Sequence, residues 1–143
     1  MIDINVLRQI CIKVREAAYN VYLRGGLPVN ERTPFPTGIC GWVSVALGSV
    51  LATEYPEEMF FYVRGYCGEQ SHAWIQYYDY VIDITADQFE EVSEEILIVQ
   101  RYDSRLHTRF SIEDSTRVND EFLKCYLQYK EENLIYKEYF NLK

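Results

Sequence analysis

The chain has 143 residues, of which 48% are hydrophobic and 25% are charged, a composition typical of a globular protein that excludes a largely disordered one. Its 22 acidic side chains outnumber the 14 basic ones and give a formal net charge of −8, which argues against a nucleic-acid partner because phosphate contacts need a basic face. We expect one domain over residues 1–143, since this length is common for a single domain.

The four cysteines, Cys11, Cys40, Cys67 and Cys125, are widely spaced and form no C-x-x-C pair, so that no structural metal is expected. The first residues lack the basic segment and apolar stretch of a secretory signal. The longest weakly polar run, Gly41 to Ala52, is too short to span a bilayer. We therefore expect free thiols, no membrane partner and a cytoplasmic location, with export as an effector as the alternative.

Two helices are expected in the first third of the chain. Apolar residues recur at helical spacing from Ile2 to Leu23, and Gly25-Gly26 then provides a stop signal. After a proline-rich extended loop, a second helix is predicted from near Cys40 to near Glu54. Small residues recur every four positions along this second helix, which would let it approach a sheet closely (Cys40, Ser44 and Gly48).

Strand-like runs rich in aromatic and β-branched residues follow. Three of them extend from Met59 to Tyr66, from Ser71 to Tyr78 and from Tyr80 to Thr85, and Ile96 to Gln100 is a candidate fourth. Because these strands follow one another at short spacing, between helical segments, the pattern indicates an α+β domain with an antiparallel sheet.

The last third of the chain is predicted to hold a loop and a helix. Arg101 to Val118 is polar and locally basic, which is typical of a solvated loop; a flap over an anionic or polar substrate is the alternative. His107 lies in this segment and is expected to be exposed to solvent. Asp120 to Phe140 is predicted to form a single helix with aromatic residues along one side.

Cys40 lies where a nucleophilic thiol would be most useful, in the first turn of a predicted helix. Free backbone N–H groups and the positive end of the helix dipole stabilise a thiolate at such a position. The Cys40 backbone N–H would also be a suitable donor to an oxyanion. Taken alone this is weak support for catalysis, because many cysteines begin helices without reacting.

His72 and Asp83 strengthen the case. Strand alternation puts His72 and Trp74 on one face. If Tyr78-Asp79 is a two-residue hairpin loop, Asp83 lies opposite Trp74, one diagonal step from His72, where its carboxylate would orient the imidazole. A three-residue loop would turn Asp83 to the other face, and Asp87 would then be the fallback acid. The same residues are also compatible with His72 as an ordinary sheet residue.

These motifs resemble a known group of enzymes. The segment from Gly38 to Ser44 (Gly-Ile-Cys-Gly-Trp-Val-Ser), His72-Ala73-Trp74, and the run from Asp83 to Phe89 look like the papain-like and transglutaminase-like cysteine enzyme superfamily. The resemblance implies a helix bearing Cys40 packed on an antiparallel sheet, with N- and C-terminal helices flanking this core. It also implies a catalytic triad of Cys40, His72 and Asp83.

One departure concerns the oxyanion hole. Papain-like proteases carry a glutamine shortly before the nucleophile, and the segment before Cys40 has none. A second oxyanion donor would have to be a backbone N–H or a side chain such as Asn30 or Gln70. Thr85 and Gln88 are further candidates for supporting the triad, or for simply capping the turn after their strand.

The function expected from these residues is cysteine-dependent hydrolysis of an amide bond (peptide, isopeptide or glutamine side chain) through a thioester on Cys40, without metal or cofactor. The substrate would be a peptide or protein. Trp42 and Trp74 are candidates for lining the substrate groove, or else for filling the helix–sheet interface. Two alternatives remain open, a catalytically inactive binding or adaptor module and an amide acyl transferase of the transglutaminase type. The sequence gives no indication of the oligomeric state.

Overall fold

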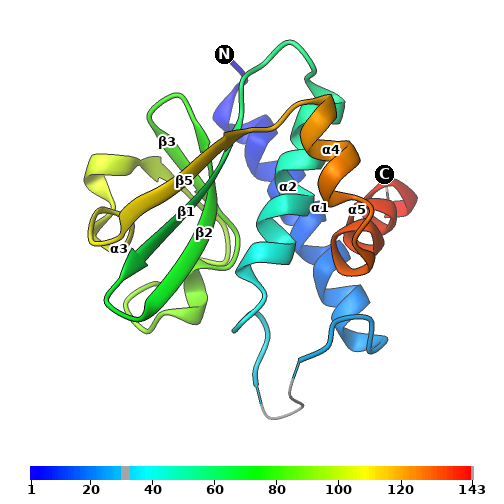
Figure 1. Cartoon of the computed structure of the whole chain (residues 1–143), viewed down its shortest axis with the longest axis horizontal. Helices are drawn as coiled ribbons and strands as arrows, with labels where there is room; N and C mark the ends of the chain where they lie inside the picture. Colours follow the sequence, from blue (N-terminus) through cyan, green and yellow to red (C-terminus); the bar gives the residue numbers. More distant parts are fainter. Residues whose placement is uncertain (30–32, 143) are drawn as a thin grey trace.

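The computed structural model of the chain describes residues 1–29 and 33–142, and within them it is an α+β structure. Within these residues, every helix except one short one lies on the same face of a five-stranded sheet (Figure 1). The helices are α1 (Ile4–Leu23), α2 (Cys40–Glu54), α3 (Arg105–Thr108), α4 (Asp120–Tyr126) and α5 (Lys130–Leu142), with 3-10 turns at Ala86–Gln88 and Arg101–Asp103. The strands are β1 (Phe61–Cys67), β2 (Gln70–Tyr77), β3 (Tyr80–Asp83), β4 (Leu97–Gln100) and β5 (Ser111–Arg117).

Both helices predicted in the first third of the chain are present, and α2 has the predicted bounds. The first begins at Asp3, whose side chain accepts a hydrogen bond from the backbone N–H of Asn5, as an N-cap residue should. The second is buried along most of its length, because α1, α5 and the sheet contact it on different sides. None of the helices in the described residues is both long and apolar enough to cross a membrane.

The line of small residues on α2 does bring it close to the sheet, as predicted. The Ser44 hydroxyl donates a hydrogen bond to the backbone carbonyl of Ala73 on β2, at 3.1 Å. A Cβ atom placed on Gly48 would lie only 2.8 Å from Cδ1 of Ile75, on the same strand. This close packing fixes the position of α2, and so of Cys40 at its first turn, relative to β2.

The sheet has the order β4-β3-β2-β1-β5, and every neighbouring pair is antiparallel. The first three strands lie within or close to the predicted runs, and the candidate fourth strand is present as β4. In the β2–β3 hairpin Tyr77 pairs with Tyr80, so the turn is the two-residue loop Tyr78-Asp79, with Tyr78 at a positive φ of 52°. The predicted register is therefore confirmed.

Two expectations for the last third of the chain are wrong. The segment predicted as a loop contains α3 and β5, and β5 pairs with β1 at the sheet edge. Every side chain of β5 is exposed, so the strand lacks the alternating hydrophobic pattern that would reveal it. The predicted closing helix is two helices, and the turn between them lets α5 pack against α1 and α2.

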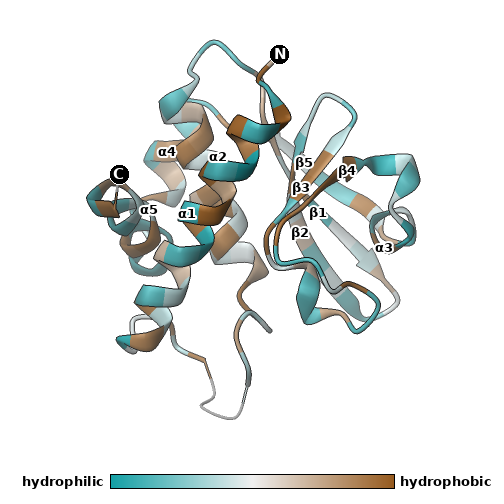
Figure 2. Ribbon diagram, turned by 180° about the vertical axis from the view of Figure 1, so that it is seen from behind, coloured by the Kyte–Doolittle hydropathy of each residue, from teal (hydrophilic) through white to brown (hydrophobic). Residues whose placement is uncertain are grey.

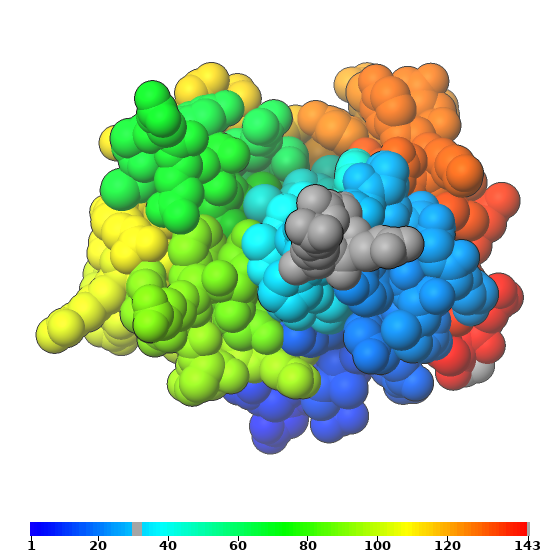
Figure 3. All heavy atoms as spheres, turned by 90° about the horizontal axis from the view of Figure 1, so that it is seen from below, coloured from blue at the N-terminus to red at the C-terminus, as the bar shows by residue number. Residues whose placement is uncertain are grey.

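The two faces of the sheet carry two separate hydrophobic clusters. The larger one lies between the sheet and α1, α2 and α5, and Figure 2 shows hydrophobic segments (brown) in these helices and in the strands. The smaller one covers the opposite face and includes Trp74, Val81, Leu106 and Phe110. At one end of the molecule, the chain at the start of α2 (cyan) reaches the surface beside the strand segments (green), as Figure 3 shows.

Candidate active site

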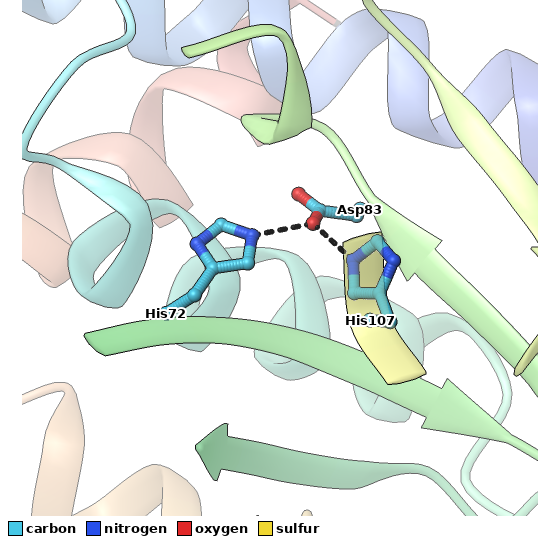
Figure 4. Close-up of side chains that lie close together, drawn as sticks. All are labelled: His72, Asp83 and His107. Atoms are coloured by element: carbon cyan, nitrogen blue, oxygen red, sulfur yellow. Dashed lines mark hydrogen bonds and ion pairs between the residues drawn. The ribbon is translucent and has the colours of Figure 1, made fainter. Parts of the chain in front are cut away.

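His72 on β2 and Asp83 at the end of β3 lie in direct contact (Figure 4). The distance between His72 Nε2 and Asp83 Oδ2 is 2.6 Å, and both residues are only 1% exposed. The hairpin register causes this contact, because it puts the two residues one diagonal step apart on one face of neighbouring strands. The sequence-predicted pair is thus brought together.

The other oxygen of Asp83 is held by the residue two positions further along the chain. Asp83 Oδ1 accepts hydrogen bonds from the backbone N–H of Thr85 at 2.9 Å and from its hydroxyl at 3.3 Å. Burial by itself would raise the pKa of Asp83, but the charge of His72 and hydrogen bonds from two histidines outweigh it and hold this pKa well below its usual range. Asp83 is therefore a fixed, ionised carboxylate.

The second histidine is His107 on α3, and the expectation that it is exposed to solvent is wrong. His107 is fully buried, and its Nε2 lies 2.7 Å from the same Asp83 Oδ2 that contacts His72. Ser104 Oγ lies 2.6 Å from His107 Nδ1 and accepts the backbone N–H of His107, which leaves the serine proton free to point at Nδ1. This arrangement favours the tautomer in which His107 Nε2–H donates to Asp83.

The local signal for His107 was the Ser-x-x-His spacing, in which a serine caps the first turn of a short helix. That spacing indicates that α3 begins at Ser104, but not where the ring of His107 lies. The contact with Asp83 joins residues 24 positions apart and depends on the path of the intervening chain. Sequence reasoning therefore missed it.

The remaining ring nitrogen of His72, Nδ1, is not in contact with Asp83. Asp83 occupies Nε2, and Gln88 Nε2 lies at 3.5 Å from Nδ1. Burial opposes protonation of His72, but the charge and hydrogen bond of Asp83, together with a smaller contribution from Cys40, outweigh it and raise the pKa of His72 to about 9. Cys40 is thus close enough to His72 to affect its pKa, although the hydrogen bonds of the described residues include none between the two side chains.

Cys40 itself is half-buried at the first turn of α2, whose N-terminus has no side-chain cap. The backbone N–H groups of that turn have no acceptor within the helix. The other three thiols are also free, with Cys11 buried, Cys67 half-buried and Cys125 exposed. Burial raises the pKa of Cys11 to about 12, so this thiol is unreactive at neutral pH.

A groove of about 270 Å³ adjoins Cys40, and Trp42 is part of its wall, as expected of a substrate-binding residue. The structure corrects the same expectation for Trp74, which is 0% exposed and does not reach this groove. Trp74 packs edge-on against the His107 ring, with centroids 4.8 Å apart, and so belongs to the small cluster that surrounds the histidines. Trp74 lies on the face of β2 that carries the small cluster, a face that His72 shares, whereas Ala73 on the other face lines the groove.

The remaining candidates fall into three groups. Thr85 and Gln88 do contact the site, the first through Asp83 and the second through His72. The fallback acid Asp87 instead forms an ion pair with Arg15 at 2.7 Å. Of the proposed oxyanion donors, Gln70 is an exposed residue at the start of β2, and Asn30 lies outside the described residues.

The same three buried side chains could in principle hold a metal ion. His72, Asp83 and His107 each offer a ligand atom, and these atoms lie within 4.8 Å of one another. Both Nε2 atoms, however, already contact one carboxylate oxygen at hydrogen-bond distance, and the other oxygen is bound to Thr85. A metal would have to displace these hydrogen bonds, so the donor set as arranged suits proton transfer and charge stabilisation better.

Comparison of the chain with protein-family models, with curated proteins and with solved structures found no match. The site is therefore interpreted from its own chemistry. A thiol at a helix start can attack a carbonyl carbon when a nearby imidazole moves the proton. A carboxylate that holds the imidazole in place supports this transfer.

Proposed function

We propose that this chain is a cysteine-dependent hydrolase that cleaves an amide bond of a peptide or protein through a thioester on Cys40. The proposal includes a papain-like or transglutaminase-like core, with α2 as the helix that bears the nucleophile. The motifs around Cys40, His72 and Asp83 support this assignment, since they resemble those of that superfamily. The α+β architecture and the packing of α2 on an antiparallel sheet agree with it.

One observation carries the proposal: Asp83 binds His72 through Nε2, and the resulting rise in the pKa of His72 includes a smaller contribution from the nearby Cys40. An imidazole fixed through one nitrogen can use the other to exchange a proton with a nucleophile. A histidine with a raised pKa also remains charged at neutral pH, where an imidazolium stabilises a neighbouring thiolate. A histidine with a purely structural role would need no such link to a half-exposed thiol.

In the proposed reaction, the Cys40 thiolate attacks the carbonyl carbon of the substrate amide and forms a C–S bond. The oxyanion is stabilised by backbone N–H groups at the uncapped start of α2. The C–N bond then breaks, and the imidazolium of His72 gives its proton to the departing amine. Water attacks the resulting thioester while His72 takes up a proton, which releases the acid and restores the thiolate–imidazolium pair.

Alkylation of the intact chain with iodoacetamide at pH 6 tests the first step. An unperturbed thiol with a pKa of about 8.5 is almost wholly protonated at this pH, so only a stabilised thiolate reacts rapidly. We expect mass spectrometry of the digested protein to find Cys40 modified at least about tenfold faster than Cys125. Because Cys125 is exposed and Cys40 only half-exposed, accessibility alone would give the opposite order.

Two matched variants complete this test. Replacement of His72 with Gln should reduce alkylation of Cys40 to the rate of Cys125, because the imidazolium that stabilises the thiolate is lost. Cys125→Ser should leave the rate at Cys40 unchanged. If Cys40 reacts no faster than Cys125 in the unmodified chain, or if His72→Gln has no effect, the proposed nucleophile is rejected and the non-catalytic binding module is favoured.

A further inference from the structure

Glu132, in the first turn of α5, has a buried carboxylate oxygen without a partner. The residue is only 7% exposed, and its Oε1 forms no hydrogen bond within the described residues. Burial raises the pKa of Glu132, and a hydrogen bond from its own backbone N–H offsets only part of this effect. An unsatisfied buried carboxylate destabilises a fold, so its presence calls for a ligand that completes it.

Glu132 lines the same groove as Cys40. Tyr62 on β1 links the two, because its hydroxyl experiences the charge of both Cys40 and Glu132, and burial together with these charges raises the pKa of Tyr62. The same hydroxyl lies 3.7 Å from where a Cβ on Gly41 would be, next to Cys40 in the first turn of α2. The carboxylate and the candidate nucleophile therefore belong to one binding site.

The walls of the groove suit an aliphatic chain that ends in a cation. Trp42, Tyr62 and Tyr126 offer aromatic surface, against which methylene groups pack and cations are attracted. The groove volume of about 270 Å³ lies below the roughly 300 Å³ at which pockets for whole small molecules begin, so it fits one side chain. Arg64 also lines the groove, but its side chain is exposed and Glu132 is not among its ion-pair partners in the described residues.

We propose that this groove is a subsite for a basic side chain of the substrate, lysine or arginine, whose cationic group binds Glu132 while the neighbouring carbonyl is presented to Cys40. This inference rests on the proposed function and adds to it the class of residue next to the bond that is attacked. The cation pairs with the charge of the Glu132 carboxylate, which lines the groove, and the aromatic walls hold the aliphatic stem.

The test uses two activated esters that differ only in charge, the p-nitrophenyl esters of Nα-acetyl-lysine and Nα-acetyl-norleucine. Each can acylate Cys40 and release p-nitrophenolate, which is measured by absorbance. We expect the lysine ester to acylate the protein about tenfold faster than the norleucine ester, after subtraction of the rates with Cys40→Ala, because a charge-assisted hydrogen bond is worth at least that factor.

The charge on Glu132 should account for this preference. In Glu132→Gln the ratio of the two rates should fall to about one. In Glu121→Gln, which removes an exposed carboxylate of α4, the ratio should stay as in the unmodified chain. Equal rates for both esters in the unmodified chain, each above the rate with Cys40→Ala, or an unchanged ratio in Glu132→Gln, would overturn the subsite while leaving the hydrolase proposal intact.

A second measurement does not depend on turnover. Nα-acetyl-lysine methylamide should slow alkylation of Cys40 by iodoacetamide, whereas the norleucine analogue at the same concentration should not. Protection by the lysine compound in a protein that neither ester acylates would support the subsite and reject the hydrolase. Equal protection by both compounds, or none by either, would reject the subsite.

Discussion

His107 binds Asp83 through the same carboxylate oxygen that contacts His72, with an Nε2–Oδ2 distance of 2.7 Å. The two imidazoles come from different elements, α3 and β2, and Asp83 lies between them in Figure 4. Because Thr85 holds the other oxygen, the carboxylate has little freedom to rotate. We therefore expect His107 to act on His72 through Asp83 as a positioning residue, with no direct role at the thiol of Cys40 in the proposed reaction.

The effect of His107 can be measured with two substitutions. His107→Leu removes a donor to a buried carboxylate, so we expect the free energy of unfolding to fall by about 2–3 kcal/mol in urea titrations. The pKa of Asp83 should also rise, and the acid limb of the pH profile for Cys40 alkylation should move to higher pH. His107→Gln keeps a hydrogen-bond donor, so it should restore much of the free energy of unfolding and much of the original pH profile. An alkylation profile in His107→Leu that matches the unmodified chain would leave His107 with a structural role only.

The chain provides a matched pair of acids for testing the role of Asp83. Asp83→Asn should lower the rate of Cys40 alkylation at pH 6 by about tenfold or more, because His72 loses the charge that keeps it protonated. Asp87→Asn removes a carboxylate four residues away that pairs with Arg15, and it should leave the rate unchanged. Equal effects of the two substitutions would show that the loss comes from general destabilisation of this segment.

Metal removal should have no effect on the reactivity of Cys40. The ring nitrogens of His72 and His107 that could coordinate a metal are engaged with Asp83. We therefore expect no bound metal there for a chelator to remove. We expect the alkylation rate at pH 6 to be the same before and after dialysis against EDTA. Added Zn²⁺ should not raise the melting temperature. An EDTA-sensitive rate, or stabilisation by stoichiometric Zn²⁺, would instead assign the cluster to a metal.

Local patterns in the sequence were sufficient for the elements that hold Cys40, His72 and Asp83. The bounds of α2 follow from helical periodicity after a proline-rich loop, and the contact of His72 with Asp83 follows from a two-residue hairpin. Both features are set by neighbours within about a dozen residues. The sequence could therefore predict them without knowledge of the rest of the fold.

The parts that escaped prediction depend on long-range packing. His107 reaches Asp83 only because the chain leaves β4 at the sheet edge and crosses the far face of the sheet with α3. Trp74 is buried by that same crossing, and Glu132 meets Cys40 only because α5 packs beside α2. None of these contacts leaves a periodic pattern, and the exposed strand β5 lacks one as well.

The close approach of α2 to the sheet makes Gly48 sensitive to substitution. In Gly48→Ala the new methyl group would lie 2.8 Å from Ile75 and 3.1 Å from Val118, so these neighbours must shift. We expect the free energy of unfolding to fall by about 1–3 kcal/mol, although alanine has the better helix propensity. Ser49→Ala is the control, because the buried Ser49 hydroxyl has no partner in the described residues and its removal should cost little. Stability unchanged in Gly48→Ala would contradict the tight packing.

The charge on His72 predicts how stability depends on pH. The pKa of His72 is about 9 in the folded protein, above the ordinary value of about 6.5. Its contribution to the free energy of unfolding is therefore fully present below about pH 6.5 and is lost as the pH rises through 9. A buried histidine with this shift contributes on the order of 3 kcal/mol. The opposite holds for Asp83, whose lowered pKa gives a contribution that is present above about pH 4 and is lost as the pH falls through the folded value.

Melting temperatures between pH 6.5 and 9.5 measure the contribution of His72. We expect the unmodified chain to lose on the order of 5 °C or more over this interval, and Asp83→Asn to lose clearly less, since its His72 has no carboxylate partner. The thiol of Cys11, whose pKa is raised mainly by burial and to a smaller extent by the charge of Asp83, also destabilises the fold as the pH rises, but the larger part of this effect is common to both proteins and cancels in the difference. Parallel curves for the two proteins would mean that Asp83 does not hold the charge on His72.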